Sequence, residues 1–286
     1  MTLTELIKRS TETISQIYPE REAREMVLAY LCHALGVQRH THIIEPSYEV
    51  PSDRIDEILL AMERMAAGEP LQYVIGEASF YGRTFHVSPS VLIPRPETEL
   101  LCRFALDSAE GTNKVLDLCT GSGCIAWTLA LEKPGIEVTA VDISDDALQV
   151  ASTQDFIEET GRTGAVAPTF IKSDVLAEEL LPDQKYDMIL SNPPYVMDKE
   201  KELMRTNVLD HEPHLALFVP DDDPLKFYKA IARHSARLLS EDGIGIVEIN
   251  EALGPETSDL FMAAGFADVH IESDLSDRHR FVIFRR

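Results

Sequence analysis

The sequence predicts an α/β protein in which a small helical domain precedes a larger domain built on a mainly parallel sheet. Two patterns predict this. From about residue 113, seven strand-like stretches alternate with helical ones, which is typical of a parallel sheet with helices on both faces. In residues 1–75, apolar side chains recur at helical spacing in three stretches. We therefore expect a Rossmann-like seven-stranded sheet with a small N-terminal helical domain and a β-hairpin connector between the two.

The first 75 residues are expected to form three amphipathic helices. The second is the clearest, because side chains such as Ala23 and Val27 fall on one helical face. Gly68 and Pro70 are stop signals after the third. The next stretch, SFYGRTFHVS, alternates apolar and polar residues around a central glycine, as a short hairpin does. The expected boundaries are 1–75 for the helical domain, 76–90 for the β-hairpin connector and 91–286 for the sheet domain.

The strands expected in the larger domain are rich in Val, Ile and Phe and are bounded by turn residues. They are KVLDL (114–118), VTAVDI (138–143), TFIKSD (169–174), YDMILS (186–191), GIGIVEIN (243–250), DVHIES (268–273) and RFVIFR (280–285). Helical stretches between them include residues 122–133 and 145–161. Only DLSDRH separates the last two strands, which is too short for a helical crossover. These two strands should therefore pair antiparallel.

Composition narrows the class of protein. The chain has 286 residues, and 49 Asp and Glu against 26 Lys and Arg give a formal net charge of −23. Binding nucleic acid through its phosphates requires a basic face, so we expect no direct nucleic-acid partner. No apolar run reaches the roughly 20 residues of a membrane span, and the charged start is unlike a signal peptide. The four cysteines form no CxxC pair, which indicates reduced thiols. We expect a cytoplasmic protein that binds neither a membrane nor a metal ion.

A glycine turn follows the first strand of the sheet, in the stretch VLDLCTGSGCIA (115–126). Gly121 and Gly123 lead from the strand into a helix, and Asp142 ends the next strand about 20 residues later. Such a turn lets a ligand approach the backbone closely, and the spaced carboxylate can accept hydrogen bonds from two ribose hydroxyls. The pattern predicts a nucleoside cofactor. The alternative is a glycine turn without a ligand.

The same stretch satisfies the G-x-G-x-x-A pattern of dinucleotide sites, but Asp117 argues against a dinucleotide. A carboxylate beside the turn would repel a pyrophosphate at the helix N-terminus. It would suit a ligand with an ammonium group and no phosphate, and S-adenosyl-L-methionine is such a ligand. Asp142 would then bind its ribose and Asp174 its adenine amino group. A helix N-cap is the alternative role for Asp174.

The fourth strand ends abruptly at SNPPY, residues 191–195. Parallel strands present their carboxyl ends to one crevice, so Asn192 should face the same ligand as the glycine turn. The prolines fix the backbone and remove two N–H donors. The Asn192 side-chain oxygen and the Pro193 carbonyl are then two acceptors, and Tyr195 adds an aromatic face. This set matches a planar NH2 group as methyl acceptor, because accepting both hydrogens would aim its nitrogen at the donor. The alternative is that the prolines only end a strand.

The chain resembles the HemK/PrmC family, the glutamine-amide methyltransferases that act on peptide chain release factors. LDLCTGSGCIA, AVDIS and SNPPY match methyltransferase motifs that amino-group DNA methyltransferases share. GEPLQYVIGEASFYG (68–82), LIPRPETE (92–99) and HEPHLALF (211–218) are similar to segments that are more specific to the family. The resemblance covers essentially the whole chain. It implies an S-adenosylmethionine-dependent methyltransferase fold for residues 91–286 and a substrate-docking role for residues 1–75.

The resemblance also implies an activity, the transfer of a methyl group to the side-chain amide of the glutamine in the Gly-Gly-Gln loop of release factors. Together with the loop chemistry, it implies a set of cofactor-binding residues: Asp117, Cys119, Thr120, Gly121, Ser122, Gly123, Asp142, Asp174, Val175 and Asn192. Asn192, Pro193, Pro194 and Tyr195 would hold the glutamine, with Asn192 and Pro193 as the catalytic pair. The chain departs from the family pattern at Cys119, where glycine is usual, and at Val175, where an aromatic residue is common.

The motifs alone leave three alternatives. An amino-group DNA methyltransferase would have to flip a base and neutralise phosphates, which the acidic composition opposes. A non-catalytic protein that kept the cofactor fold would not need the intact glycine turn, Asp142 and NPPY. A glutamine methyltransferase that acts on a ribosomal protein fits the motifs equally well.

Overall fold

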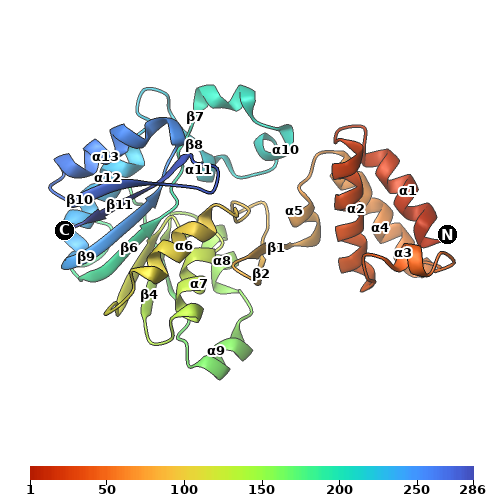
Figure 1. Ribbon diagram of the computed structural model, residues 1–286, viewed down its shortest axis with the longest axis horizontal. Coiled ribbons are helices and arrows are strands. Elements are labelled where there is room, and N and C mark those ends of the chain that lie inside the picture. The colour runs from red at the N-terminus through yellow and green to blue at the C-terminus, as the bar shows by residue number, and fades with distance from the viewer. The chain divides into compact units, whose positions relative to one another are not determined.

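A computed structural model describes residues 1–286, and the chain divides into two compact units (Figure 1). The N-terminal unit comprises residues 1–77 and the short segment 205–211, and the sheet unit comprises residues 78–204 and 212–286. The chain therefore passes between the units three times. No sequence pattern indicated that residues 205–211 belong with the N-terminal helices.

The N-terminal unit is helical. Its helices are α1 (Leu3–Ile14), α2 (Glu20–Leu35), α3 (Thr41–Ile44), α4 (Ile55–Ala66), α5 (Leu71–Ile75) and α10 (Thr206–Leu209). The three amphipathic helices expected from the sequence are α1, α2 and α4. Their apolar faces share one core, in which Leu6, Val27 and Ile58 are fully buried. Arg205 pairs with Glu22 of α2 at 2.8 Å, which joins the returning segment to the helices.

Seven strands form the sheet of the second unit, in the order β10-β11-β9-β6-β3-β4-β5. They are β3 (Lys114–Leu118), β4 (Glu137–Asp142), β5 (Thr169–Lys172), β6 (Tyr186–Ser191), β9 (Leu239–Glu248), β10 (Ala267–Ser273) and β11 (His279–Arg285). The central strands are parallel, with Val115 of β3 opposite Val138 of β4 and Met188 of β6. β11 pairs antiparallel with both β9 and β10. The predicted Rossmann-like sheet and its antiparallel C-terminal hairpin are confirmed.

Helices cover both faces of this sheet (Figure 1). α6 (Thr98–Asp107) and α7 (Cys124–Glu132) pack on one face, and α12 (Lys226–Leu238) and α13 (Gly254–Ala263) pack on the other. Side chains alternate along a strand, so Val115 of β3 lies in the first core and Leu116 in the second. A strand buried on both faces is expected to be apolar throughout. The one charged residue of β3 after its first position, Asp117, is therefore exceptional.

The expected hairpin consists of β1 (Glu77–Phe80) and β2 (Arg83–His86). Its two turn residues, Tyr81 and Gly82, have positive φ angles of 50° and 73°, as a type I′ turn requires. Phe85 is fully buried in the core beside α7, and Arg83 pairs with Glu159 at 2.6 Å. These contacts hold the hairpin against the sheet unit.

The expectation of one helix over residues 145–161 is wrong. The structure has α8 (Asp145–Ser152) and α9 (Ile157–Thr163), separated by residues 153–156. The Gln154 side chain explains the break. The amide oxygen of Gln154 accepts from the N–H of His86, and its amide nitrogen donates to the carbonyls of His86 and Ser122. Residue 154 has to leave the helix to reach these two segments.

Short elements complete the chain. They are α11 (His214–Leu217), the strands β7 (Val196–Met197) and β8 (Phe218–Val219), and 3-10 turns at Ser52–Arg54, Asp198–Leu203 and Glu251–Leu253. β7 and β8 pair in parallel, which links the segment after SNPPY to the segment after α11. None of the helices combines the length and the apolar character needed to cross a membrane.

Candidate active site

A cavity of about 440 Å³ lies at the carboxyl ends of the parallel strands β3, β4, β5 and β6. Loops that follow neighbouring parallel strands converge at this edge of a sheet. Most residues expected to bind the cofactor or the substrate line the cavity: Cys119, Thr120, Gly121, Ser122, Asp142, Asp174, Val175, Asn192 and Pro194. The structure does not bring the other expected residues to the wall, namely Asp117, Gly123, Pro193 and Tyr195.

The loop after β3 turns left-handed at both of its glycines, with φ angles of 55° at Gly121 and 79° at Gly123. At Gly121 an added Cβ would meet no atom within 4 Å, so this stretch of backbone borders open space. At Gly123 a Cβ would come within 3.0 Å of the Ala151 Cβ and 3.2 Å of Trp127. Gly123 therefore allows α7 to pack, and Gly121 allows a ligand to approach the backbone.

Cys119 adopts a conformation that favours glycine, the residue that the resemblance leads us to expect there. Its φ angle is 60°, which costs a non-glycine residue about 1 kcal/mol. The side chain packs against the core under α12 and α13, and burial raises the pKa of its thiol. The chain thus keeps the left-handed turn of the loop without the usual glycine.

Asp117 is fully buried under the glycine loop. Its Oδ2 accepts a hydrogen bond of 2.6 Å from the Thr120 hydroxyl, and its Oδ1 has no hydrogen-bond partner. Burial raises the pKa of Asp117 to about 7, opposed by the bond from Thr120 and assisted by the charge of Asp142. Asp117 therefore acts on the loop through Thr120.

Asp142 ends β4, and backbone donors hold both of its carboxylate oxygens. Oδ2 accepts from the N–H of Gly121 at 2.9 Å, and Oδ1 accepts from the N–H of Ser144 at 3.0 Å. Burial raises the pKa of Asp142, and these backbone bonds lower it. Each oxygen keeps further lone-pair capacity, so the carboxylate can also accept from two neighbouring hydroxyl groups.

Asp174 follows β5 and lines the same cavity. Its Oδ1 accepts from the N–H of Leu176 at 2.8 Å, and its carbonyl accepts from the N–H of Ala177 at 3.0 Å, so the residue starts a turn. No helix follows, and the alternative role of Asp174 as a helix N-cap is wrong. Val175, the next residue, is buried and adds an apolar side chain to the wall.

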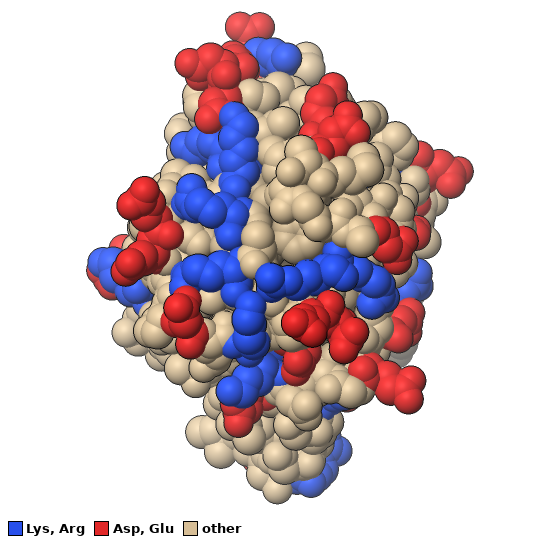
Figure 2. Space-filling model, turned by 90° about the vertical axis from the view of Figure 1, so that its left-hand side faces the viewer, with Lys and Arg blue, Asp and Glu red and all other residues tan.

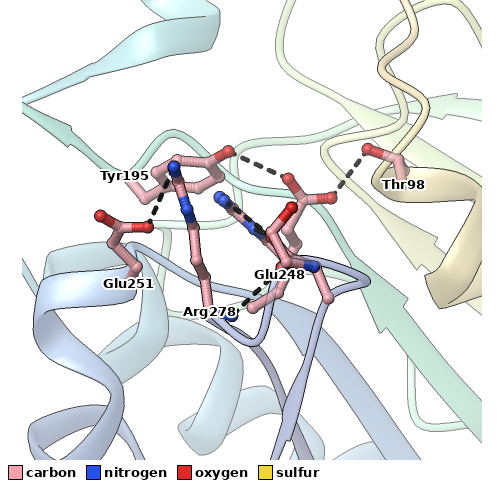
Figure 3. A network of polar contacts seen from close by, with 8 residues as sticks. Thr98, Tyr195, Glu248, Glu251 and Arg278 are labelled. Atoms are coloured by element: carbon pink, nitrogen blue, oxygen red, sulfur yellow. Dashed lines mark hydrogen bonds and ion pairs between the residues drawn. The ribbon is translucent and has the colours of Figure 1, made fainter.

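Asn192 is joined to a polar network through Thr98. Figure 3 shows the rest of this network, in which Thr98 and Tyr195 both reach Glu248. The Asn192 amide nitrogen donates to the Thr98 hydroxyl at 3.1 Å, and Thr98 donates to Glu248 at 2.7 Å. The Tyr195 hydroxyl donates to the other oxygen of Glu248 at 2.9 Å. Tyr195 thus directs its hydroxyl toward Glu248, and its ring is not part of the cavity wall.

Glu248 ends β9 and is 1% exposed. Burial raises the pKa of this carboxyl, while the hydrogen bonds from Thr98 and Tyr195 and the charge of Arg280 lower it. Sequence reasoning missed both Thr98 and Glu248. The available signal for Glu248 was a glutamate inside an otherwise apolar strand, GIGIVEIN, where a charge needs partners.

Two segments that are far apart in sequence, residues 89–95 and 213–216, close another side of the cavity. Glu212 joins them. Its carboxylate accepts from the Arg95 guanidinium at 2.5 Å and from the N–H of Ile93 at 3.2 Å, and Glu212 is 3% exposed. Sequence reasoning missed this pair, although it connects two of the stretches that resemble the family, LIPRPETE and HEPHLALF.

The residues on the wall fit S-adenosyl-L-methionine. Asp142 has acceptor capacity for ribose hydroxyls, and the open space over Gly121 admits a ligand to the backbone. Apolar side chains such as Ile143 and Val175 can cover a flat base, and the Asp174 carboxylate can accept from its amino group. No group of three or more potential metal ligands occurs in the described chain.

Two family models match the chain. The PrmC N-terminal domain matches residues 5–76, and the Methyltransferase small domain matches residues 97–215. A release factor glutamine methyltransferase from Bacteroides thetaiotaomicron is 37% identical over 275 residues, which cover 96% of this chain and 97% of the relative. Another, from Bacillus subtilis, is 34% identical over 288 residues, which cover 98% of this chain and 96% of the relative.

Solved structures share the fold. A methyltransferase from Pyrococcus furiosus aligns with a TM-score of 0.50 at 15% identity, over 82% of this chain and 98% of that chain. The hMettl16 catalytic domain, solved with MAT2A 3′UTR hairpin 6, aligns with a TM-score of 0.53 at 14% identity, over 80% of this chain and 82% of that chain. The expected methyltransferase fold is thereby confirmed. Because the curated relatives match almost from end to end, the chain belongs to the release factor glutamine methyltransferase family.

Proposed function

We propose that this chain transfers a methyl group from S-adenosyl-L-methionine to the side-chain amide nitrogen of the glutamine in the Gly-Gly-Gln loop of peptide chain release factors. The observation that carries the proposal is the position of Asn192, whose side chain shares one cavity with Gly121 and Asp142. An amide acceptor beside a wall that fits a nucleoside suits a substrate with an NH2 group to donate. The relatives are named for this class of substrate.

In the proposed step, the glutamine NH2 donates to the Asn192 side-chain oxygen and to the Pro193 carbonyl. The contacts within the chain leave both oxygens without a donor. The nitrogen lone pair forms the new N–C bond, the methyl–sulfur bond breaks with its electron pair remaining on sulfur, and the nitrogen then loses one proton to water. Positive charge that develops on the nitrogen is stabilised by the two oxygens.

On the cofactor side of the cavity, some residues contact the cofactor and others support the residues that do. We propose that the loop residues Cys119 to Ser122 approach the cofactor through their backbone, that Asp142 binds the ribose, and that Asp174 and Val175 meet the adenine. Asp117 and Gly123 lie behind the wall, so their role is to shape the loop.

The substrate side has the same division. We propose that Asn192 and Pro194 contact the glutamine from the cavity wall, and that Pro193, which is not part of the wall, contributes only its backbone carbonyl. Tyr195 would support them through Glu248. Glu212 and Arg95 hold the segments that close the cavity and so help to exclude water from the reaction.

We propose that residues 1–75 dock the release factor and that residues 91–286 carry out the reaction. The hairpin of residues 76–90 would connect these two domains. The surface of the N-terminal unit supports a protein partner, because Ile43 and Ile44 are 65% and 74% exposed side by side. Docking at a distance from the glutamine would position a flexible side chain, as remote contacts often do in catalysis.

We propose no nucleic-acid substrate. On the side of the C-terminus, Figure 2 shows a band of Lys and Arg side chains with Asp and Glu beside it. Lys185 and Arg286 both donate to the Leu239 carbonyl, so cations gather where β6 and β9 begin and β11 ends. β11 runs antiparallel to β9, so the end of β11 lies beside the start of β9. This edge of the sheet is therefore opposite the carboxyl ends of the parallel strands, where the cavity lies. A nucleic acid bound there would not present a base to Asn192.

Labelled methyl transfer tests the proposal. The protein is given methyl-labelled S-adenosylmethionine and, in separate reactions, an intact release factor, a short peptide of its Gly-Gly-Gln loop, and duplex DNA. We expect strong labelling of the intact factor, weak labelling of the peptide because it lacks remote contacts, and no labelling of DNA. Labelled adenine in DNA beside an unlabelled factor would favour an amino-group DNA methyltransferase instead.

A further inference from the structure

Thr98 lies between Asn192, the proposed substrate acceptor, and the buried carboxylate of Glu248. Figure 3 shows its contact with Glu248. Its hydroxyl oxygen lies 3.1 Å from Asn192 Nδ2 and 2.7 Å from Glu248 Oε2. Thr98 is 2% exposed, so water does not replace these partners readily. The methyl-transfer step assigns no function to this hydroxyl, although it is the group that touches the Asn192 amide.

The chemistry of the three groups gives the network a direction. A threonine hydroxyl has one proton to donate, and an ionised carboxylate only accepts. Burial raises the pKa of Glu248, and the two donated hydrogen bonds and the charge of Arg280 lower it. Both of its oxygens accept in the structure, one from the Thr98 hydroxyl and the other from the Tyr195 hydroxyl. Thr98 therefore donates its proton to Glu248 and can only accept from Asn192. The Asn192 amide must then present its NH2 to Thr98.

We propose that Thr98, held by Glu248, is a positioning residue that fixes the Asn192 amide with its oxygen toward the substrate. The inference rests on the proposed function for the identity of that substrate. If the Asn192 amide were rotated by half a turn, its NH2 would face the NH2 of the substrate. Two hydrogen-bond donors would then face each other, and neither would have an acceptor. Because the oxygen and the NH2 of an amide are similar in size, packing alone does not choose between the two orientations.

The first test reads the amide directly and needs no substrate. The chain has four asparagines, so labelling only asparagine with ¹⁵N gives few side-chain signals, and Asn192→Ala identifies that of Asn192. We expect the Asn192 NH2 protons to exchange with water about 10-fold more slowly in the parent and in Thr98→Ser than in Thr98→Val, the factor for one net hydrogen bond. Equal exchange in the parent and in Thr98→Val would overturn the inference.

The second test measures turnover. Thr98→Val keeps the shape of the side chain and removes the hydroxyl, so kcat on an intact release factor should fall about 10-fold or more. The Kd for S-adenosylmethionine should stay within about twofold, and Thr98→Ser should restore most of the turnover. Thr257→Val in α13 is the matched control, because Thr257 is also fully buried and its hydroxyl has no partner. This control should behave as the parent does.

The outcomes separate the inference from the proposed function. A loss in Thr98→Val that Thr98→Ser fails to restore, or one that affects cofactor affinity as much as kcat, would show a merely structural role and overturn the inference. A parent protein that methylates no release factor refutes the proposed function, while the exchange rates still decide the orientation of Asn192. The parent and Thr98→Ser decide this even if Thr98→Val does not fold, since an unprotected Asn192 amide in both would contradict the inference.

Discussion

The backbone N–H of Gly121 and the carboxylate of Asp142 form a hydrogen bond of 2.9 Å that joins the loop after β3 to the end of β4. The other oxygen of Asp142 is fixed by the N–H of Ser144. One carboxylate therefore sets the shape of the glycine loop and, in the proposed complex, also binds the ribose. Changing Asp142 should affect the cofactor more than the fold.

Asp142→Ala should weaken S-adenosylmethionine binding by about 1.5–3 kcal/mol, because charge-assisted hydrogen bonds to the ribose are lost. Asp142→Asn keeps one acceptor oxygen and should lose less. Calorimetry with both variants measures the difference. NAD bound as tightly as S-adenosylmethionine by the parent protein would contradict the cofactor assignment.

Asp117 should make stability depend on pH. An aspartate in the unfolded chain has a pKa near its ordinary value of 3.8, whereas burial raises the pKa of Asp117 in the folded protein to about 7. The folded protein therefore holds the proton more tightly. The contribution of Asp117 to stability is complete below about pH 4 and is lost as the pH rises toward about 7, by up to about 4 kcal/mol.

Asp117→Asn tests this pH dependence, because the amide cannot titrate and keeps an acceptor for Thr120. Urea titrations at pH 5 to 8 measure the free energy of unfolding of both proteins. The value for the variant should increase relative to that for the parent as the pH rises. A difference between the two proteins that stays constant with pH would refute this account.

Asn192→Ala should lower kcat by roughly 10²-fold, as removal of one preorganised polar contact does elsewhere. Its fold and its affinity for S-adenosylmethionine should change little, because the Asp142 and glycine-loop contacts remain. Steady-state kinetics on an intact release factor measure the loss. Turnover within a few-fold of the parent would mean that the asparagine and its prolines only end the strand.

Arg95→Met should destabilise the fold by about 2–3 kcal/mol, because it leaves the buried Glu212 carboxylate without its cation. This is less than for a fully buried pair, since the Arg95 side chain is 32% exposed. The double variant with Glu212→Gln removes the stranded charge and should be more stable than Arg95→Met alone. Thermal unfolding of both variants measures this, and a double variant that is less stable than Arg95→Met would contradict it.

The sequence carried enough information for the fold and for the groups at the strand ends that line the cavity. Both depend on local patterns, because a buried parallel strand followed by Gly121 or by Asn192 and two prolines is visible within a few residues. The topology of a parallel sheet then brings these strand ends together. Nine of the residues expected at the site lie on the cavity wall for this reason.

Groups that act through another residue could not be predicted in the same way. Thr98 and Glu248 are 150 residues apart in sequence, and Ile93 and Glu212 are 119 apart, so no local spacing relates them. Asp117 resembles a ligand-binding residue in the sequence because the loop residues next to it are expected to bind the ligand. Side chains alternate between the two faces of a strand, however, and this places Asp117 of β3 on the face that α7 covers. Gln154 broke an expected helix for a tertiary reason, its bonds to His86 and Ser122.

Mass spectrometry of an intact release factor after incubation with this protein and S-adenosylmethionine tests the central claim most directly. The account predicts one added methyl group, located by fragmentation on the side-chain amide of the glutamine in the Gly-Gly-Gln loop. It also predicts that Asn192→Ala, as the matched enzyme control, leaves nearly all of that glutamine unmodified over the same time. An unmodified glutamine with the parent enzyme, or a methyl group on another residue of the factor, would contradict the account.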